Sequence, residues 1–452
     1  MKKYTRLIIL IIFCTVLVAV YVFLNPLMPI LTGHAAKNLA SAVFISGRQV
    51  DSVRAYDISF FPVNLASVKV DYDDSSVVAR LLWAKSKAVY RKDAGVALLR
   101  EGSEEELLSK EYNIPKVEKY SSDMTWPMGE VINDTIASNI DLDKLGSIAD
   151  GLIAGEYGGN PFTFMVLHNG VPVVEKYKSG FNAQTRLLSW SMAKSVVNAM
   201  TGLLVGDGKL DIYSKPILDE WRNDERAEIT LNDILQMQSG LEWNENYGNE
   251  SDVNVMLHVK KDIPGFVIAK PSVAKAGKQW LYSSGSTNIA SEIIRRTINS
   301  DSLYYDLAYN RLLAKIGVRN PVFETDLNGV LVGSSYLYMT TRDYARFGLL
   351  YLRDGVFNGE RILPEGWVDY TSSPASASDN GYGSCFWLNS AGEYPDVPRD
   401  MYSCNGHNGQ NIFIIPSEDL VVVMTGFSPK SNPVDKNSLL KDVINSISEL
   451  ND

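Results

Sequence analysis

The hydrophobic and polar positions divide the chain into an apolar N-terminal run, a short alternating region and a long mixed region. Residues 7–24 are apolar apart from Thr15, and Lys2, Lys3 and Arg6 precede them. A run of this length is at the lower limit for a helix that crosses a bilayer. The basic flank predicts a cytoplasmic N-terminus and export of the remaining chain to the extracytoplasmic side.

A cleaved signal peptide is the alternative interpretation of this apolar run. The small residues typical of a cleavage site do not follow it directly, because Asn25-Pro26 comes next. Cys14 follows Phe13, which differs from the acceptor site of a lipoprotein. We therefore expect an uncleaved single-pass anchor in the cytoplasmic membrane, with residues 1–36 forming this anchor and a proline-containing stalk.

Alternation of apolar and polar positions within residues 37–125 predicts a small β-rich extension followed by a charged linker. Residues 68–72 and 77–81 flank an acidic turn, and residues 88–90 and 96–98 flank a second turn. Each pair of runs is expected to form a hairpin. The extension could pack on the rest of the protein or bind a partner.

The mixed region, residues 126–452, begins with a hairpin pattern over 162–177 and continues with mainly helical patterns over 189–317. Strand-like runs follow, and an amphipathic helix comes last. The expected strands are residues 384–388, 402–405, 411–415 and 420–425. Sequential hairpins predict an α/β (α+β) fold, in which helices flank an antiparallel sheet and a helical lobe is inserted between its strands.

Ser191 and Lys194 form a Ser-x-x-Lys sequence at the start of one predicted helix. Residues three apart lie on one face of a helix, and a neutral lysine can accept the proton of a serine hydroxyl. Burial and the positive end of the helix dipole would both favour the neutral amine. The same spacing recurs at residues 272–275 and 438–441, so it does not identify a site by itself.

Two later segments supply the partners that such a pair requires. Tyr282-Ser283-Ser284-Gly285 precedes a helical pattern, and its tyrosine hydroxyl could pass a proton to a leaving group. A neighbouring ammonium is expected to lower the pKa of that tyrosine. Gly406-His407-Asn408-Gly409-Gln410 opens a strand whose edge could donate a backbone N–H to an oxyanion. A second His-Asn-Gly, at residues 168–170, lies between two apolar runs and is predicted to be a structural hairpin turn.

In this order, the three motifs resemble those of the serine hydrolases related to class C β-lactamases and penicillin-binding proteins. Residues 229–241 and 339–348 also look like segments of that superfamily. Within it, the motifs are most similar to those of 6-aminohexanoate-dimer hydrolases and related esterases. The resemblance covers roughly residues 126–450 and implies a β-lactamase/transpeptidase-like fold.

The resemblance implies a role for each motif residue. It makes Ser191 the nucleophile, Lys194 its general base and Tyr282 the proton relay to the leaving group. The backbone N–H groups of Ser191 and Gln410 would form the oxyanion hole. Tyr247 falls near a tyrosine that faces the substrate in the aminohexanoate hydrolases, and a packed loop aromatic is an equal alternative.

Two departures from the β-lactamase pattern bear on the substrate. Ser284, expected to face the substrate, replaces an asparagine, and His407, Asn408 and Gly409 stand where β-lactamases carry Lys-Thr-Gly. Serine and neutral histidine offer less than asparagine and lysine to the amide and carboxylate of a β-lactam. We therefore expect hydrolysis of a small amide or ester through an acyl-enzyme, with weak or absent antibiotic hydrolysis.

A D-alanyl-D-alanine carboxypeptidase or β-lactamase is the nearest alternative function. A non-catalytic binding protein for cell-wall fragments, or an interaction protein that acts through the extension, belongs to a different class. Retention of Ser191, Lys194 and Tyr282 together disfavours a role in binding alone. The oligomeric state is open.

Composition narrows the remaining chemistry. The net charge of −10 and the lack of a basic stripe argue against nucleic-acid binding. The four histidines show no ligand spacing, so no metal is expected, and an acyl-enzyme mechanism needs no cofactor. Cys385 and Cys404 lie in strand-like segments that could face each other, either as a disulfide or as two buried thiols.

Overall fold

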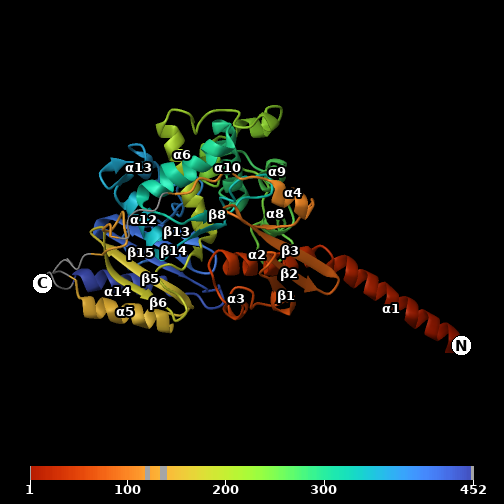
Figure 1. Cartoon of the computed structure of the whole chain (residues 1–452). Coiled ribbons are helices and arrows are strands. Elements are labelled where there is room, and N and C mark those ends of the chain that lie inside the picture. The colour runs from red at the N-terminus through yellow and green to blue at the C-terminus, as the bar shows by residue number, and fades with distance from the viewer. Residues whose placement is uncertain (1, 118–122, 133–139, 449–452) are drawn as a thin grey trace.

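The computed structural model describes residues 2–117, 123–132 and 140–448, and Figure 1 shows their arrangement. Parts of the expected units 37–125 and 126–452 therefore lie outside the described residues. Helix α1 (Lys2–Leu24) projects away from the rest of the molecule. Its segment Tyr4–Leu24 has a mean hydropathy of 3.2 and buries nothing, so by length and composition it could cross a membrane.

The extension is a four-stranded antiparallel meander covered by a helix, and both predicted hairpins are confirmed. Helix α2 crosses the sheet because Ala35, Ala36 and Ala40 are small enough to allow close approach. The expected stalk is wrong for residues 27–36, which belong to α2 and are largely buried. The elements are α2 (Leu27–Phe44), α3 (Val50–Ala55), β1 (Ser67–Asp71), β2 (Ser76–Leu81), β3 (Ala84–Arg91), β4 (Gly95–Leu98) and α4 (Glu104–Ser109).

The extension packs on the body and shares a hydrophobic core with it. Val322 and Tyr338 of the body lie in the same apolar cluster as the buried face of α2. Polar contacts reinforce this interface, because the buried Lys37 of α2 forms an ion pair with Glu324 of the body. Arg91 of β3 donates to the carbonyl oxygen of Thr325 at 2.7 Å.

The body is built on a six-stranded antiparallel sheet with the strand order β12-β13-β14-β15-β5-β6. Helices α5 and α14 cover one face of this sheet, and α6 and α12 lie on the other. The expected strand 384–388 is shortened to Trp387–Leu388, since Cys385 has a φ of 60° that interrupts extended backbone. The strands are β5 (Pro161–His168), β6 (Val171–Tyr177), β12 (Trp387–Leu388), β13 (Tyr402–Gly406), β14 (Gln410–Ile415) and β15 (Leu420–Gly426).

Most of the remaining helices form the inserted lobe, as expected from the sequence. Its smaller strands form a three-stranded sheet of order β7-β9-β8 and a separate β10–β11 hairpin. These elements are β7 (Leu187–Leu188), β8 (Val322–Phe323), β9 (Leu337–Met339), β10 (Val356–Phe357) and β11 (Glu360–Arg361). The body helices are α5 (Leu142–Ala154), α6 (Ala193–Gly206), α7 (Leu231–Leu235), α8 (Asp252–His258), α9 (Ile263–Ile268), α10 (Ser284–Ile298), α11 (Asp301–Asp306), α12 (Thr341–Leu352), α13 (Trp367–Ser372) and α14 (Lys436–Ser448).

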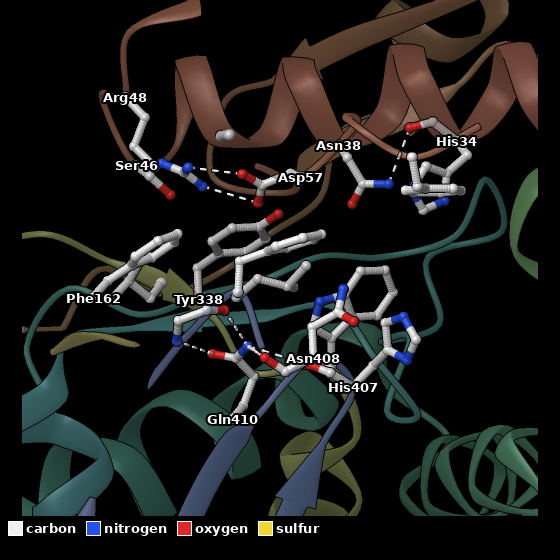
Figure 2. A pocket seen from close by; sticks show the side chains of 17 residues that line it. His34, Asn38, Ser46, Arg48, Asp57, Phe162, Tyr338, His407, Asn408 and Gln410 are labelled. Atoms are coloured by element: carbon white, nitrogen blue, oxygen red, sulfur yellow. Dashed lines mark hydrogen bonds and ion pairs between the residues drawn. The ribbon is translucent and has the colours of Figure 1, made fainter. Parts of the chain in front are cut away.

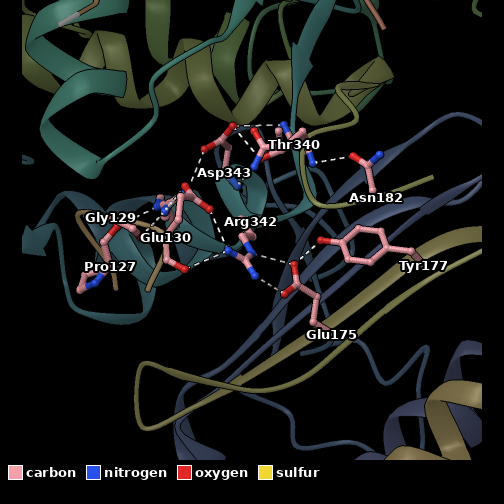
Figure 3. Close-up of polar contacts among 11 residues, drawn as sticks. Pro127, Gly129, Glu130, Glu175, Tyr177, Asn182, Thr340, Arg342 and Asp343 are labelled. Atoms are coloured by element: carbon pink, nitrogen blue, oxygen red, sulfur yellow. Dashed lines mark hydrogen bonds and ion pairs between the residues drawn. The ribbon is translucent and has the colours of Figure 1, made fainter. Parts of the chain in front are cut away.

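A polar cluster attaches the start of α12 to the edge of the main sheet (Figure 3). Thr340 and Asp343 form a reciprocal capping box that satisfies the free N–H groups of the first turn. Arg342 donates to both carboxylate oxygens of Glu175 at 2.8 and 2.7 Å and to Glu130 at 2.8 Å. This bidentate pair holds the start of α12 against the main sheet. The same sheet carries the third motif, residues 406–410.

Candidate active site

Ser191 lies in a 3₁₀ turn, Trp190–Met192, immediately before helix α6. The turn packs against β13 and β14 of the main sheet. Trp190 holds a φ of 45°, which a bulky side chain rarely adopts, and the neighbouring Ser189 hydroxyl donates to the carbonyl oxygen of Trp190 at 2.9 Å. The strained turn therefore fixes Ser191 at the junction of the sheet and the helical lobe.

Lys194 is buried and converges on three oxygen atoms. Its Nζ lies 2.9 Å from Ser191 Oγ, 3.0 Å from Ser284 Oγ and 3.0 Å from the carbonyl oxygen of Ser334. Burial lowers the pKa of Lys194 to about 8, and the nearby carboxylate of Glu245 opposes this decrease. The expected effect of burial on the amine is confirmed.

Tyr282 contacts the same pair from the loop that precedes α10. The Lys194 Nζ lies 5.0 Å from the centre of its ring. Burial and Glu245 raise the pKa of the Tyr282 phenol above its usual value, and a hydrogen bond with Ser191 partly opposes them. The expected lowering of this pKa is wrong, because the largest influence on the phenol is its burial. The phenol therefore stays protonated at neutral pH and can donate.

Glu245 completes the polar network, and the motifs did not reveal it. Ser284 donates to it twice, from its hydroxyl at 2.5 Å and from its backbone N–H at 2.9 Å. The indole of Trp243 donates to it at 2.5 Å and the hydroxyl of Tyr247 at 3.2 Å. In the sequence, the only indication that Glu245 belongs to the site was its position two residues before Tyr247. Ser284 and Tyr247 are thus brought into the site.

The third motif forms a hairpin turn between β13 and β14. Asn408 and Gly409 have φ values of 59° and 87°, and Gln410 begins β14. The other His-Asn-Gly copy forms the predicted turn between β5 and β6, but there the histidine ends the strand and the turn has two residues instead of three. Their surroundings differ, because the His407 ring stacks on Tyr247 at 4.8 Å. Burial and the nearby Lys430 lower the pKa of His407 to about 4, so its imidazole is neutral.

Helix α2 of the extension lies beside Trp190 and the third motif, which the sequence did not predict. A cavity of about 40 Å³ lies between these elements. Figure 2 shows His34 and Asn38 of α2 on one side of it and His407 and Gln410 on the other. This volume holds roughly two or three water molecules. The His34 ring lies 6.5 Å from the ring of Trp190, next to the serine. Burial and His407 lower the pKa of His34 to about 4.

The cysteines and histidines do not form a further reactive group. Cys385 and Cys404 are free and buried, which supports the alternative of two thiols rather than a disulfide. Burial raises the pKa of both thiols to about 12. Within the described ranges, no cluster of His, Cys, Asp and Glu could hold a metal ion.

Comparison with known proteins identifies the class. The beta-lactamase family model matches residues 156–442, so the chain belongs to that family and is a hydrolase of it. Over 287 residues it is 25% identical to the 6-aminohexanoate-dimer hydrolase of Paenarthrobacter ureafaciens, covering 58% of this chain and 71% of that protein. The predicted superfamily and hydrolase class are thereby confirmed.

Solved structures support the same fold. A Bacillus anthracis protein provisionally assigned as a 6-aminohexanoate-dimer hydrolase matches with a TM-score of 0.55 and 22% identity, over 67% of this chain and 83% of that chain. A family VIII carboxylesterase matches with a TM-score of 0.53 and 15% identity, over 71% of this chain and 100% of that chain. The β-lactamase/transpeptidase-like fold predicted from the motifs is confirmed.

Proposed function

We propose that this protein is a membrane-anchored serine hydrolase that cleaves an amide or ester bond through an acyl-enzyme on Ser191. The observation that carries this proposal is the buried Lys194 amine, 2.9 Å from the Ser191 hydroxyl. Because burial lowers the pKa of this amine to about 8, a useful fraction is neutral near physiological pH. A neutral amine at hydrogen-bond distance can act as the general base.

The reaction proceeds in two steps, acylation of Ser191 and hydrolysis of the acyl-enzyme. In the first, the Ser191 hydroxyl loses its proton to Lys194 and attacks the carbonyl carbon of the substrate. The bond to the leaving amine or alcohol breaks, and Tyr282 passes the proton from Lys194 to that group. In the second step, water loses a proton to Lys194 and attacks the acyl-enzyme. The carboxylic acid leaves, and the proton returns to Ser191.

The backbone N–H groups of Ser191 and Gln410 form the oxyanion hole in this proposal. Ser191 lies in a turn packed on β13 and β14, and Gln410 is the first residue of β14. Two donors on rigid neighbouring elements stabilise the charge on the carbonyl oxygen without reorganising. One relative is named a 6-aminohexanoate-dimer hydrolase and one structural neighbour a carboxylesterase, so amides and esters both belong in the first substrate screen.

A fluorophosphonate probe tests the nucleophile directly. The full chain, purified in detergent, is treated with the probe and the modified peptide is located by mass spectrometry. We expect the label on Ser191, and its loss in Ser191→Ala and Lys194→Ala. Ser438→Ala is the matched control, since Ser438 has the same spacing to a lysine but lies in the partly exposed first turn of α14, where its hydroxyl donates to Asp435 at 2.7 Å. Absence of label on folded protein would refute the hydrolase mechanism proposed here.

The membrane part of the proposal rests on the apolar helix α1 and its basic flank. The helical segment Tyr4–Leu24 has 21 residues and is therefore about 30 Å long, which matches the hydrocarbon thickness of a bilayer. We expect the chain to remain in membranes after alkaline washing, and protease added to spheroplasts to digest the body. A body that resists protease in spheroplasts would contradict the extracytoplasmic location. A chain that the alkaline wash releases would contradict the membrane anchor.

A further inference from the structure

The turn that joins β2 to β3 exposes two large apolar side chains. Leu82 is 70% exposed and Trp83 is 46% exposed, and they form the two-residue turn between Leu81 and Ala84. Such turns favour glycine, asparagine or aspartate, because these residues tolerate positive φ. Leu82 instead has a φ of 51°. Formation of the hairpin alone therefore does not explain a Leu-Trp pair at its end.

The same turn lies beside the last turn of helix α1. The Trp83 ring lies 4.9 Å from the ring of Tyr21, and its indole N–H donates to Asn25 at 3.2 Å. Tyr21 is three residues before the end of α1, or roughly 4.5 Å along the helix axis. The exposed pair is therefore level with the end of the apolar helix, where tryptophan and tyrosine are enriched in membrane proteins.

Two exposed basic residues flank this turn. Arg80 of β2 and Lys85 of β3 are direct partners across the antiparallel ladder. Like charges opposite each other destabilise a hairpin in water. Among the residues that the structure describes, neither side chain forms an ion pair with a carboxylate. An anionic phosphate would relieve this repulsion and neutralise both charges.

We propose that the β2–β3 turn is a second membrane contact, with Leu82 and Trp83 in the headgroup region and Arg80 and Lys85 on anionic phospholipids. The inference rests on the proposed anchoring by α1. Because α2 follows α1 after two residues and packs between the sheet of the extension and the body, two contacts would hold the body in one orientation. The site beside α2 would then lie at a fixed height above the membrane surface.

Fluorescence quenching on the reconstituted full chain tests this contact. The exposed Cys14 is replaced by alanine, and the buried Cys385 and Cys404 are left in place. A nitrobenzoxadiazole label is attached to Leu82→Cys or, as a matched control, to Asp73→Cys. Asp73 lies in the β1–β2 turn, at the opposite end of strand β2, roughly 17 Å away. Quenching by headgroup-region nitroxide lipid is compared with quenching by aqueous iodide.

We expect the label at position 82 to be quenched several-fold more by the lipid nitroxide than the label at position 73, and less by iodide. Arg80→Glu with Lys85→Glu should remove the extra lipid quenching seen when phosphatidylglycerol is added to phosphatidylcholine vesicles. Equal quenching at both positions would overturn the proposal, as would a label shielded from both quenchers by protein. Failure of the chain to float with vesicles would instead contradict the α1 anchor, which separates the two hypotheses.

Discussion

The hydroxyl of Ser284 donates to Glu245 at 2.5 Å, and this links a carboxylate through one side chain to the general-base candidate. The same hydroxyl lies 3.0 Å from the Nζ of Lys194. Burial lowers the pKa of Lys194, and the negative charge of Glu245 limits the decrease. The position that holds asparagine in β-lactamases therefore serves here to place a carboxylate near the lysine.

Replacing Glu245 by glutamine is expected to lower the pKa of Lys194 further. The amide keeps the shape of the side chain but removes the charge that favours the ammonium. The acid limb of kcat/KM should consequently move to lower pH, even if the maximal rate also falls. Glu242→Gln, an exposed carboxylate in the same loop, is the control and should leave the limb in place. A limb that stays in place in Glu245→Gln would show that the carboxylate does not act on the lysine.

The wild-type pH profile should show a single acid limb set by Lys194. Because the base must be neutral, activity rises with pH and reaches half its maximum near the lysine pKa of about 8. His34 and His407 both have pKa values lowered to about 4, so neither should add an inflection near neutral pH. Measuring kcat/KM for a short ester from about pH 5 to about pH 10 checks both statements. An inflection near pH 6.5 that His407→Gln removes would contradict the neutral imidazole.

Fluorescent penicillin is expected to label Ser191 far more slowly than a fluorophosphonate does. The carboxylate of a β-lactam needs a cation, and the half-buried imidazole of His407 is neutral above about pH 5. The two probes can be compared on the same preparation by in-gel fluorescence, with Ser191→Ala as the blank. Rapid and complete penicillin labelling would favour the carboxypeptidase or β-lactamase alternative.

The sequence predicted the motif residues and the hairpins because both depend on local spacing. Ser191 and Lys194 meet through the period of one helix, and the turns at residues 73–76 and 92–95 are marked by their own residues. Helix α2 was missed because Pro29 suggested a stalk. Pro29 is the third residue of α2, where a backbone N–H has no partner within the helix, so proline is tolerated there.

Effects that depend on distant segments could not be derived from the sequence. The approach of Glu245 to Ser284 joins positions 39 residues apart, and no motif records it. The expected sign of the Tyr282 shift was wrong because burial of the phenol could not be deduced from its neighbours in sequence. The backbone N–H of Cys385 donates to the carbonyl oxygen of Leu235, and Cys385 is not in an extended conformation. Strand β12 is therefore shorter than predicted.

Substitution of Gly406 by alanine should reduce activity by displacing the turn that carries Ser191. A Cβ at this position would lie 2.3 Å from the carbonyl oxygen of Ser189, so the backbone at one of the two sites must move. Misplacement by about 1 Å can cost on the order of a hundredfold in rate. Gly146→Ala in α5, where a Cβ meets nothing within 4 Å, is the control and should retain full activity. Measuring kcat with thermal unfolding in parallel separates misplacement from unfolding.

The buried ion pair between Lys37 and Glu324 joins α2 to the body. Glu324 also accepts hydrogen bonds from Ser41 at 3.0 Å and from the backbone N–H of Val96 at 2.6 Å. Its side chain is fully buried, and that of Lys37 is 5% exposed. Both charges therefore depend on each other for compensation inside the protein.

Removing one partner of this pair should strongly destabilise the protein, because the other charge stays buried without compensation. We expect Glu324→Gln to reduce the free energy of unfolding by about 3–5 kcal/mol, and Lys37→Met with Glu324→Leu to recover much of that loss. Lys315→Ala is the matched control, since its pair with Glu360 is 48% and 54% exposed and should contribute at most about 1 kcal/mol. Chemical denaturation in detergent measures all three variants. If Glu324→Gln is no less stable than Lys315→Ala, the pair does not hold the extension on the body, and the apolar contacts at Val322 and Tyr338 must do so alone.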